Sequence, residues 1–143
     1  MFKKQRALAI GAPIRKYVDP WLRKLSGGAF DSLSMDEFLQ PDFAILNDKV
    51  NRISLASLSY GTAEQVVVLI RLAIAVLLSE KEKNLVILDD RLVNADPVRL
   101  QRMLSIIDEI SENCQIVIST CEDARYLGLA ANVIRLLSYK AES

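Results

Sequence analysis

Apolar residues recur with helical spacing in two long segments of the second half of the chain. Residues 62–80 are apolar on nearly every face, which is typical of a helix that is central to a core. Residues 97–111 carry their apolar side chains on one stripe, and Pro97 suits the first helical turn. Asp96 precedes that turn and is a good N-cap. We therefore expect a buried helix followed by an amphipathic one.

Short apolar runs of strand length alternate with these helices. Residues 85–88 are continuously apolar, as in a strand of a parallel sheet that is covered on both faces. We expect further strands over 115–119 and 132–137, with a short helix over 122–130 between them. Strand, helix, strand, helix and strand in this order predict an α/β fold with a parallel sheet built by right-handed crossovers.

The N-terminal quarter reads as a helix over residues 2–25 that is interrupted at 11–13 and at 19–20, where prolines occur. Ser26-Gly27-Gly28 should end this helix, because glycine is common just past a helix terminus.

Beyond it, two short strand-like runs, 43–46 and 52–55, are separated by the polar turn Asn-Asp-Lys. This pattern predicts a β-hairpin.

No segment predicts a membrane span or a secreted protein. The longest apolar stretch, residues 66–78, is interrupted by Arg71 and is shorter than the roughly 18–20 residues that a span needs. Cys114 and Cys121 form neither a disulfide framework nor a zinc motif. Histidine is absent from the sequence, which excludes Ser-His and Cys-His catalysis and histidine metal sites within it. We expect a cytoplasmic protein.

Charge is balanced overall and uneven along the chain. With 143 residues, 51% hydrophobic and 25% charged, the sequence fits one compact domain. Eighteen basic residues match eighteen acidic ones, yet residues 1–28 hold seven basic residues against the single acid Asp19. Such an arm suits an anionic partner such as DNA. A solvated helix face is the alternative interpretation.

Two carboxylates, Asp89 and Asp90, end the apolar run 85–88. Ligands of open parallel sheets bind beyond the carboxyl ends of the strands. Many NTPases place one acid there near Mg²⁺ and another near the attacking water, because Mg²⁺ prefers carboxylate, phosphate and water oxygens. A structural turn or cap is the alternative for this pair taken alone.

A tight polar loop, Leu-Ser-Tyr-Gly-Thr-Ala-Glu-Gln at residues 58–65, opens the buried helix. A helix N-terminus offers free backbone N–H groups and a partial positive charge, so it suits a phosphate. Gly61 permits close approach, and the Ser59 hydroxyl adds a donor. An ordinary cap built on Ser59 or Thr62 is the alternative.

Taken together, the motifs resemble the C-terminal lobe of an ABC-class ATPase head of the SMC, RecF, SbcC and YhaN-like branch. The resemblance covers roughly residues 20–136. Residues 58–65 resemble the signature motif, 85–90 Walker B, 94–96 the D-loop, and 22–28 the point where a coiled-coil arm re-enters the head. It implies a helical arm over residues 1–28 and an ATPase lobe over 29–143.

The resemblance also implies roles for single residues and a set of partners. Ser59, Gly61 and Thr62 would contact the γ-phosphate of a nucleotide on an opposing head. Asp89 would support Mg²⁺, and Asp90 would orient the attacking water. Asn94 and Asp96 would belong to the D-loop at the dimer interface. The implied ligands are ATP and Mg²⁺, and the implied process is ATP-driven dimerisation of two heads in DNA repair or chromosome maintenance.

Two departures from the family pattern bear on activity. Glu122 stands at the switch position, where the YhaN-like pattern has histidine. No Gly-x-x-x-x-Gly-Lys-Ser/Thr P-loop occurs in the sequence, so we expect a piece of a longer protein or a subunit that needs a P-loop lobe as its partner. Alternatively, the chain is a non-catalytic interaction module. Binding of nucleic acid through the basic arm alone ranks below both, because aromatic residues are not interleaved there.

Overall fold

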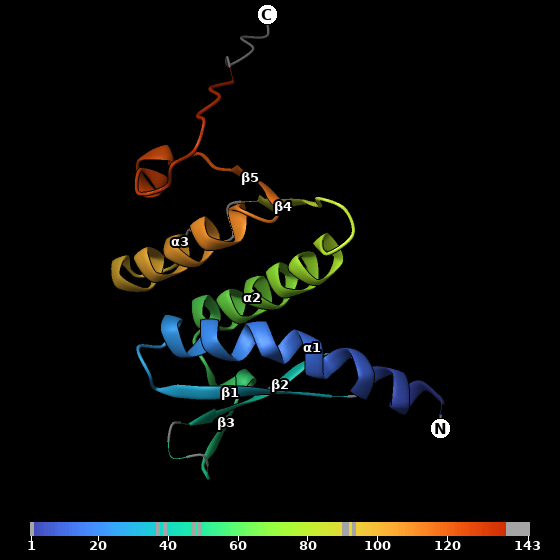
Figure 1. Ribbon diagram of the computed structural model, residues 1–143. Helices are drawn as coiled ribbons and strands as arrows, with labels where there is room; N and C mark the ends of the chain where they lie inside the picture. Colours follow the sequence, from blue (N-terminus) through green and yellow to red (C-terminus); the bar gives the residue numbers. More distant parts are fainter. Residues whose placement is uncertain are drawn as a thin grey trace, which may run out of the picture.

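The computed structural model describes residues 2–36, 38, 40–46, 48, 50–89, 92 and 94–136, with side chains from residue 11 onward. Its elements form four successive layers (Figure 1). An antiparallel sheet of three strands lies at one side, helix α1 lies across it, helices α2 and α3 follow, and a small parallel sheet of two strands lies beyond them. The fold is therefore mixed α/β, with a smaller parallel sheet than the sequence predicts.

Helix α1 (Phe2–Leu25) is continuous, so the predicted interruptions are wrong. Pro13 and Pro20 lie within it and are exposed, and each removes one backbone donor. The second half of the helix buries one apolar stripe, which comprises Ile14, Val18, Trp21, Leu22 and Leu25. Burial of each large side chain contributes about 1.5–3 kcal/mol, which offsets the effect of the prolines.

The helix ends at the predicted glycines. Gly27 and Gly28 have φ values of 65° and 88°, and the Gly28 N–H donates to the carbonyl oxygen of Arg23 at 2.8 Å. Glycine adopts this left-handed conformation without a steric penalty.

Strands β1 (Phe30–Met35), β2 (Pro41–Leu46) and β3 (Arg52–Ser54) form the antiparallel sheet in that order. The predicted hairpin is confirmed as β2 and β3, although Leu55 begins a short 3-10 helix, η1 (Leu55–Ser57), and is not part of the strand. The sequence pattern does not predict strand β1, because its sequence, Phe-Asp-Ser-Leu-Ser-Met, has no β-branched residue and buries only Leu33 fully.

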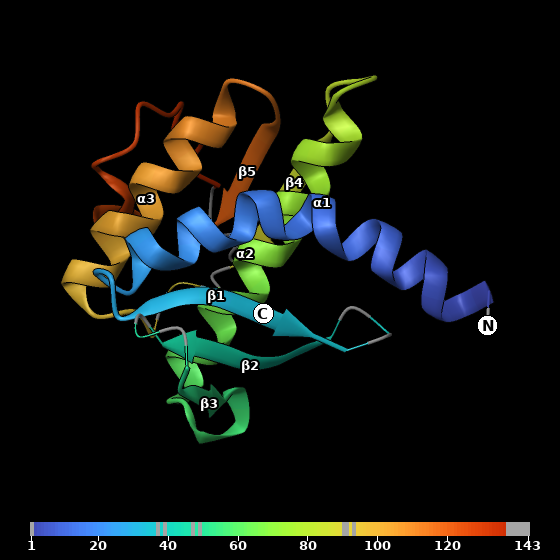
Figure 2. The same cartoon turned by 60° about the horizontal axis from the view of Figure 1, so that its bottom comes forward.

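Asp19 joins α1 to this sheet. Its Oδ1 accepts a hydrogen bond from the Leu33 N–H at 2.9 Å, and its Oδ2 lies 3.4 Å from Nη2 of Arg15. Figure 2 shows α1 running alongside β1. Partial burial raises the pKa of the Asp19 carboxyl, although the Leu33 N–H and the Arg15 charge act in the opposite direction.

Helix α2 (Tyr60–Ser79) begins and ends within two residues of the prediction. Its buried side chains contact both α1 and the parallel sheet, and they include Val66, Leu69, Leu72 and Ala73. Among the described helices, α2 is the one that is long and apolar enough to cross a membrane by length and composition, and 44% of its most apolar window is buried inside the protein. Burial against the neighbouring layers accounts for its apolar sequence.

Strand β4 (Leu85–Asp89), helix α3 (Pro97–Ser111) and strand β5 (Gln115–Ser119) form one strand–helix–strand unit. The strands are parallel, with Leu85 opposite Gln115 and Asp89 opposite Ser119. The predicted bounds of α3 and β5 are confirmed, and so is Asp96 as the N-cap of α3.

The parallel sheet is covered on one face, whereas the sequence predicts cover on both. Val86 and Leu88 are buried beneath α2 and α3, but Leu85, Ile87 and Val117 are 56%, 61% and 44% exposed. In the described part of the chain, both helices pack on the same side of the two strands (Figure 1). The outer face is apolar and open.

The chain after β5 differs most from the prediction. The expected helix over 122–130 is a single 3-10 turn, η2 (Asp123–Tyr126). Residues 132–136 form no strand, and residue 137 lies outside the described residues. A strand needs a neighbour to pair with, and this segment runs away from β4 and β5 (Figure 1).

Candidate functional site

A hollow of about 500 Å³ opens at the N-terminus of α2, beside the turn that precedes α3. Four of its lining residues come from the first turn of α2 and its cap, one from the next turn, and three from the start of α3 and the preceding turn. They are Ser59, Tyr60, Gly61, Thr62, Gln65, Asn94, Asp96 and Arg99. Two segments that are separate in sequence therefore share one site.

Ser59 is the N-cap of α2. Its Oγ accepts from the Thr62 N–H at 3.4 Å and lies 2.8 Å from Thr62 Oγ1. The cap thus accounts for one backbone donor of the first turn. Ser59 itself is exposed, so its hydroxyl faces the hollow while Thr62 is buried behind it.

Gly61 lies against the backbone of Asn94. A Cβ atom at residue 61 would stand 2.8 Å from the Asn94 carbonyl oxygen, which is closer than real Cβ contacts. The turn before α3 can approach α2 this closely because residue 61 has no side chain.

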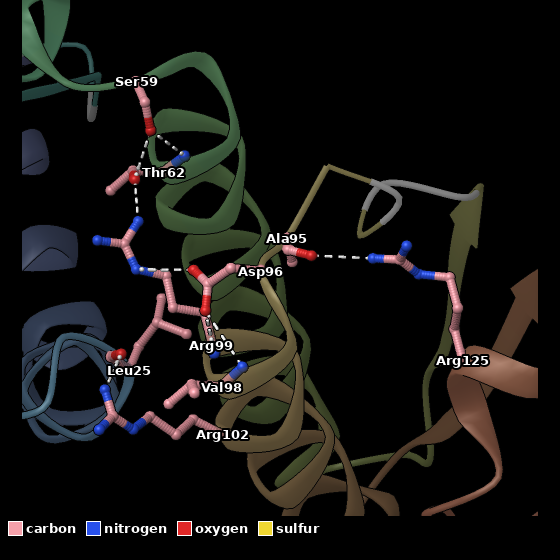
Figure 3. A network of polar contacts seen from close by, with 9 residues as sticks. All are labelled: Leu25, Ser59, Thr62, Ala95, Asp96, Val98, Arg99, Arg102 and Arg125. Carbon is pink, nitrogen blue, oxygen red and sulfur yellow. Dashed lines mark hydrogen bonds and ion pairs between the residues drawn. The ribbon is translucent and has the colours of Figure 1, made fainter.

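Arg99 connects the two segments (Figure 3). Its Nη1 donates to Thr62 Oγ1, and its Nε lies 3.5 Å from Asp96 Oδ2. Asp96 is fixed in turn, because its Oδ1 accepts from the N–H groups of Val98 and Arg99 at 3.1 and 3.0 Å. The guanidinium is therefore held at the wall of the hollow from two sides.

Gln65 is a buried polar residue of the hollow. It is 2% exposed, and its Oε1 has no hydrogen-bond partner among the described residues. A buried acceptor without a partner costs about 1–3 kcal/mol. A ligand in the hollow that donates a hydrogen bond to this oxygen would remove that cost.

Asp89 lies at the carboxyl end of β4 and does not line the hollow. Its Oδ1 accepts from Ser119 Oγ at 2.9 Å. A carboxylate with a neighbouring hydroxyl suits Mg²⁺, which keeps several waters and takes few protein ligands. The described residues contain no group of three or more acidic or cysteine side chains able to hold a metal alone. Asp90 lies outside the described residues.

Glu122 begins the η2 turn and is also outside the hollow. Its Oε2 lies 3.6 Å from Arg125 Nη1. The Nη2 of Arg125 donates to the carbonyl oxygens of Leu92 and Ala95 at 3.2 and 2.9 Å. Figure 3 shows the bond from Arg125 to Ala95. Arg125 therefore links residue 122 to the turn whose Asn94 contacts Gly61.

The structure brings five of the residues selected from the sequence to one place: Ser59, Gly61, Thr62, Asn94 and Asp96. Sequence reasoning does not identify Arg99, Gln65 or Arg125. Two signals exist, since Arg99 follows Asp96 at helical spacing and Gln65 is a polar residue within an apolar helix. No sequence signal marks Arg125.

Three curated relatives share sequence with the chain. One is an uncharacterized protein of Mycobacterium bovis and two are uncharacterized proteins of Mycobacterium tuberculosis strains, each 31% identical over 121 residues. The match includes 80% of this chain but only 14% of each relative, so the chain spans about one seventh of their length. No family model matches.

The fold is also similar to that of a solved structure. It comes from work on the structural biochemistry of ATP-driven dimerization and DNA-stimulated activation of SMC ATPases. The TM-score is 0.72 at 18% sequence identity, over 95% of this chain and 83% of that one. The chain therefore has an SMC-like ATPase fold.

Proposed function

We propose that this chain is the C-terminal half of an SMC/RecF-type ATPase head, which acts in ATP-driven head dimerisation during DNA repair or chromosome maintenance. The observation that carries the proposal is the hollow itself. It joins the signature-like residues Ser59, Gly61 and Thr62 to the D-loop-like residues Asn94 and Asp96. The SMC-like fold supports the same assignment.

In this function the N-terminus of α2 faces a nucleotide that is bound on an opposing head. Ser59 donates its hydroxyl hydrogen to the γ-phosphate, and Gly61 lets the phosphate approach the backbone. The partial positive charge at the helix N-terminus adds attraction. Asn94 and Asp96 lie beside the phosphate and belong to the interface between heads.

Asp89 ends β4, and Asp90 follows it in the sequence. Both carboxylates act on the nucleotide that is bound to the same head. Asp89 contributes one oxygen ligand to Mg²⁺, and phosphates and waters complete the coordination. Asp90 orients the attacking water. When bound, ATP and Mg²⁺ supply the phosphoryl group and its charge neutralisation, and a P-loop on a partner lobe holds the α- and β-phosphates.

The partner lobe covers the open face of the parallel sheet. Leu85, Ile87 and Val117 form an exposed apolar strip along the two strands, starting at the amino ends opposite Asp89. Neighbouring strands and helices of a P-loop lobe would bury this strip and extend the two-stranded sheet. The helical arm over residues 1–28 then stands as the root of a coiled coil.

A non-catalytic interaction module is the second candidate, and the environment of Glu122 favours it. A carboxylate at the switch position repels a triphosphate, and the Arg125 ion pair at 3.6 Å offsets that charge only partly because Glu122 is half exposed. In this function the chain pairs with a partner without turning over ATP.

Reconstitution separates the two functions. The chain is fused to an SMC-type lobe that carries a P-loop, and its mass is followed by light scattering with and without ATP–Mg²⁺. The ATPase half should dimerise only with nucleotide, whereas a constant mass under both conditions favours the interaction module. The isolated chain should show no submicromolar affinity for ATP–Mg²⁺ in calorimetry, because no P-loop is present in its sequence.

A further inference from the structure

We infer that Arg99 and Gln65 complete the hollow as a site for a hydrated polyphosphate, which rests on the proposed function and adds two ligand-binding residues to it. The residues of the signature-like loop account for one wall of the hollow. Arg99 supplies charge from the start of α3, and Gln65 supplies a further polar group from the second turn of α2.

Arg99 has N–H groups that can still donate hydrogen bonds to an anion. Its Nη1 is used on Thr62 and its Nε on Asp96, while Nη2 has no acceptor among the described residues. A guanidinium whose orientation is already fixed loses little entropy when it binds phosphate oxygens. Asp96 therefore fixes the orientation of the Arg99 guanidinium, and a bound anion accepts hydrogen bonds from its remaining N–H groups.

The hydroxyl pair beside Arg99 can extend this arrangement. Thr62 Oγ1 accepts from Arg99, so its own hydrogen is available for Ser59 Oγ at 2.8 Å. Ser59 Oγ then also accepts from the Thr62 N–H, which leaves the Ser59 hydrogen for a phosphate oxygen. Arg99 thereby orients Ser59 as a donor through one intervening hydroxyl.

Gln65 is the independent observation that points to a ligand. Its side chain is nearly fully buried in the wall, and its Oε1 lacks a donor within the part of the chain that the structure describes. A polyphosphate brings bound water, and one such water can donate to Gln65 Oε1 when the side chain turns toward the hollow, while it hydrogen-bonds to phosphate. A dry apolar ligand would leave Gln65 Oε1 and Arg99 Nη2 without hydrogen-bond partners, so the chemistry of the walls selects a hydrated anion.

The test is an NMR titration of the full chain with inorganic tripolyphosphate. The wild type should show saturable amide shifts at residues 59–65 and 94–99. Arg99→Gln should weaken this binding about tenfold, because it removes a hydrogen bond to a charged group. Arg102→Gln is the matched control, since Arg102 lies on the same helix and donates to the carbonyl oxygen of Leu25, away from the hollow (Figure 3). It should change the affinity less than twofold.

Gln65→Leu separates ligand binding from a structural role. It should weaken tripolyphosphate binding while the free energy of unfolding stays equal or rises, because the variant removes an unpaired buried acceptor. Equal tripolyphosphate affinities for wild type and Arg99→Gln, or no amide shifts in the wild type, would overturn the inference. Neither result would bear on the ATP-dependent dimerisation of the fused head, which is measured separately. Loss of dimerisation with normal tripolyphosphate binding would instead count against the proposed function alone.

Discussion

The carbonyl oxygen of Asn94 lies where a Cβ atom on Gly61 would come within 2.8 Å of it. This contact holds the turn before α3 against the first turn of α2, and it brings the two motifs into one hollow. The glycine is thus required by the approach of a neighbouring backbone, and its own φ is not positive.

Gly61→Ala should lower the free energy of unfolding by about 1–3 kcal/mol, because the new methyl group forces two backbones apart. The same change at an unobstructed helical position would instead stabilise the protein. Urea denaturation measures the difference.

Gly128→Ala is the control for this substitution. The atom nearest to its Cβ, Gln101 Oε1, would be 3.5 Å away, which is ordinary van der Waals contact. Its effect should stay within about 0.5 kcal/mol. Equal changes in unfolding free energy at the two glycines would show that the contact with Asn94 does not determine the effect of Gly61→Ala.

Arg125→Met should destabilise the turn before α3. The substitution keeps the apolar stem but removes the Arg125 donor from the Ala95 carbonyl oxygen, whereas the Leu92 carbonyl oxygen still accepts from the Ala95 N–H at 3.1 Å. Loss of that donor should cost about 1–3 kcal/mol of unfolding free energy, with faster amide hydrogen exchange at Asn94 and Ala95.

Arg135→Met provides the comparison for Arg125. Arg135 is 84% exposed and pairs with Asp123 at 3.0 Å on the surface. Exposed pairs contribute about 0–1 kcal/mol, so this variant should be close to the wild type. A larger loss at residue 135 than at residue 125 would contradict the assigned role.

Asp19→Asn should reveal a proton that is taken up on folding. Burial raises the pKa of the Asp19 carboxyl above its ordinary value of 3.8, so the folded state binds the proton more tightly than the unfolded chain. The stability of the wild type relative to Asp19→Asn should therefore be greatest below pH 3.8 and should fall as pH rises through the raised pKa. Urea denaturation from about pH 3.5 to 7 measures it, and a relative stability that increases with pH would disprove the assignment.

The sequence predicts α2, β4, α3 and β5 well, because local and tertiary signals agree there. Asp96, Pro97 and an apolar stripe define α3, and the structure gives the same bounds. The prolines of α1 mislead, because local propensity is overridden by the buried stripe that includes Ile14 and Trp21. Residues 132–136 also mislead, since an apolar run becomes a strand only beside a partner strand.

The candidate site could be predicted as two motifs but not as one hollow. The spacing of Ser59 and Gly61 indicates a phosphate loop, and Asp96 indicates a cap. Their proximity depends on the packing of α3 against α2, which no local pattern encodes. The roles of Arg99 and Arg125 arise from the same long-range packing.

Ser59→Arg in the fused head is the most direct test of the central claim. The longer side chain would fill the space that a γ-phosphate must occupy, while the loss of the cap should cost only about 1 kcal/mol, so the fold should persist. Ser57→Arg, at an exposed position of η1 outside the hollow, is the control. Light scattering should show ATP-dependent dimers for the wild type and Ser57→Arg, and monomers for Ser59→Arg. Dimers of Ser59→Arg equal to those of the wild type, with or without ATP, would contradict a nucleotide site at the N-terminus of α2.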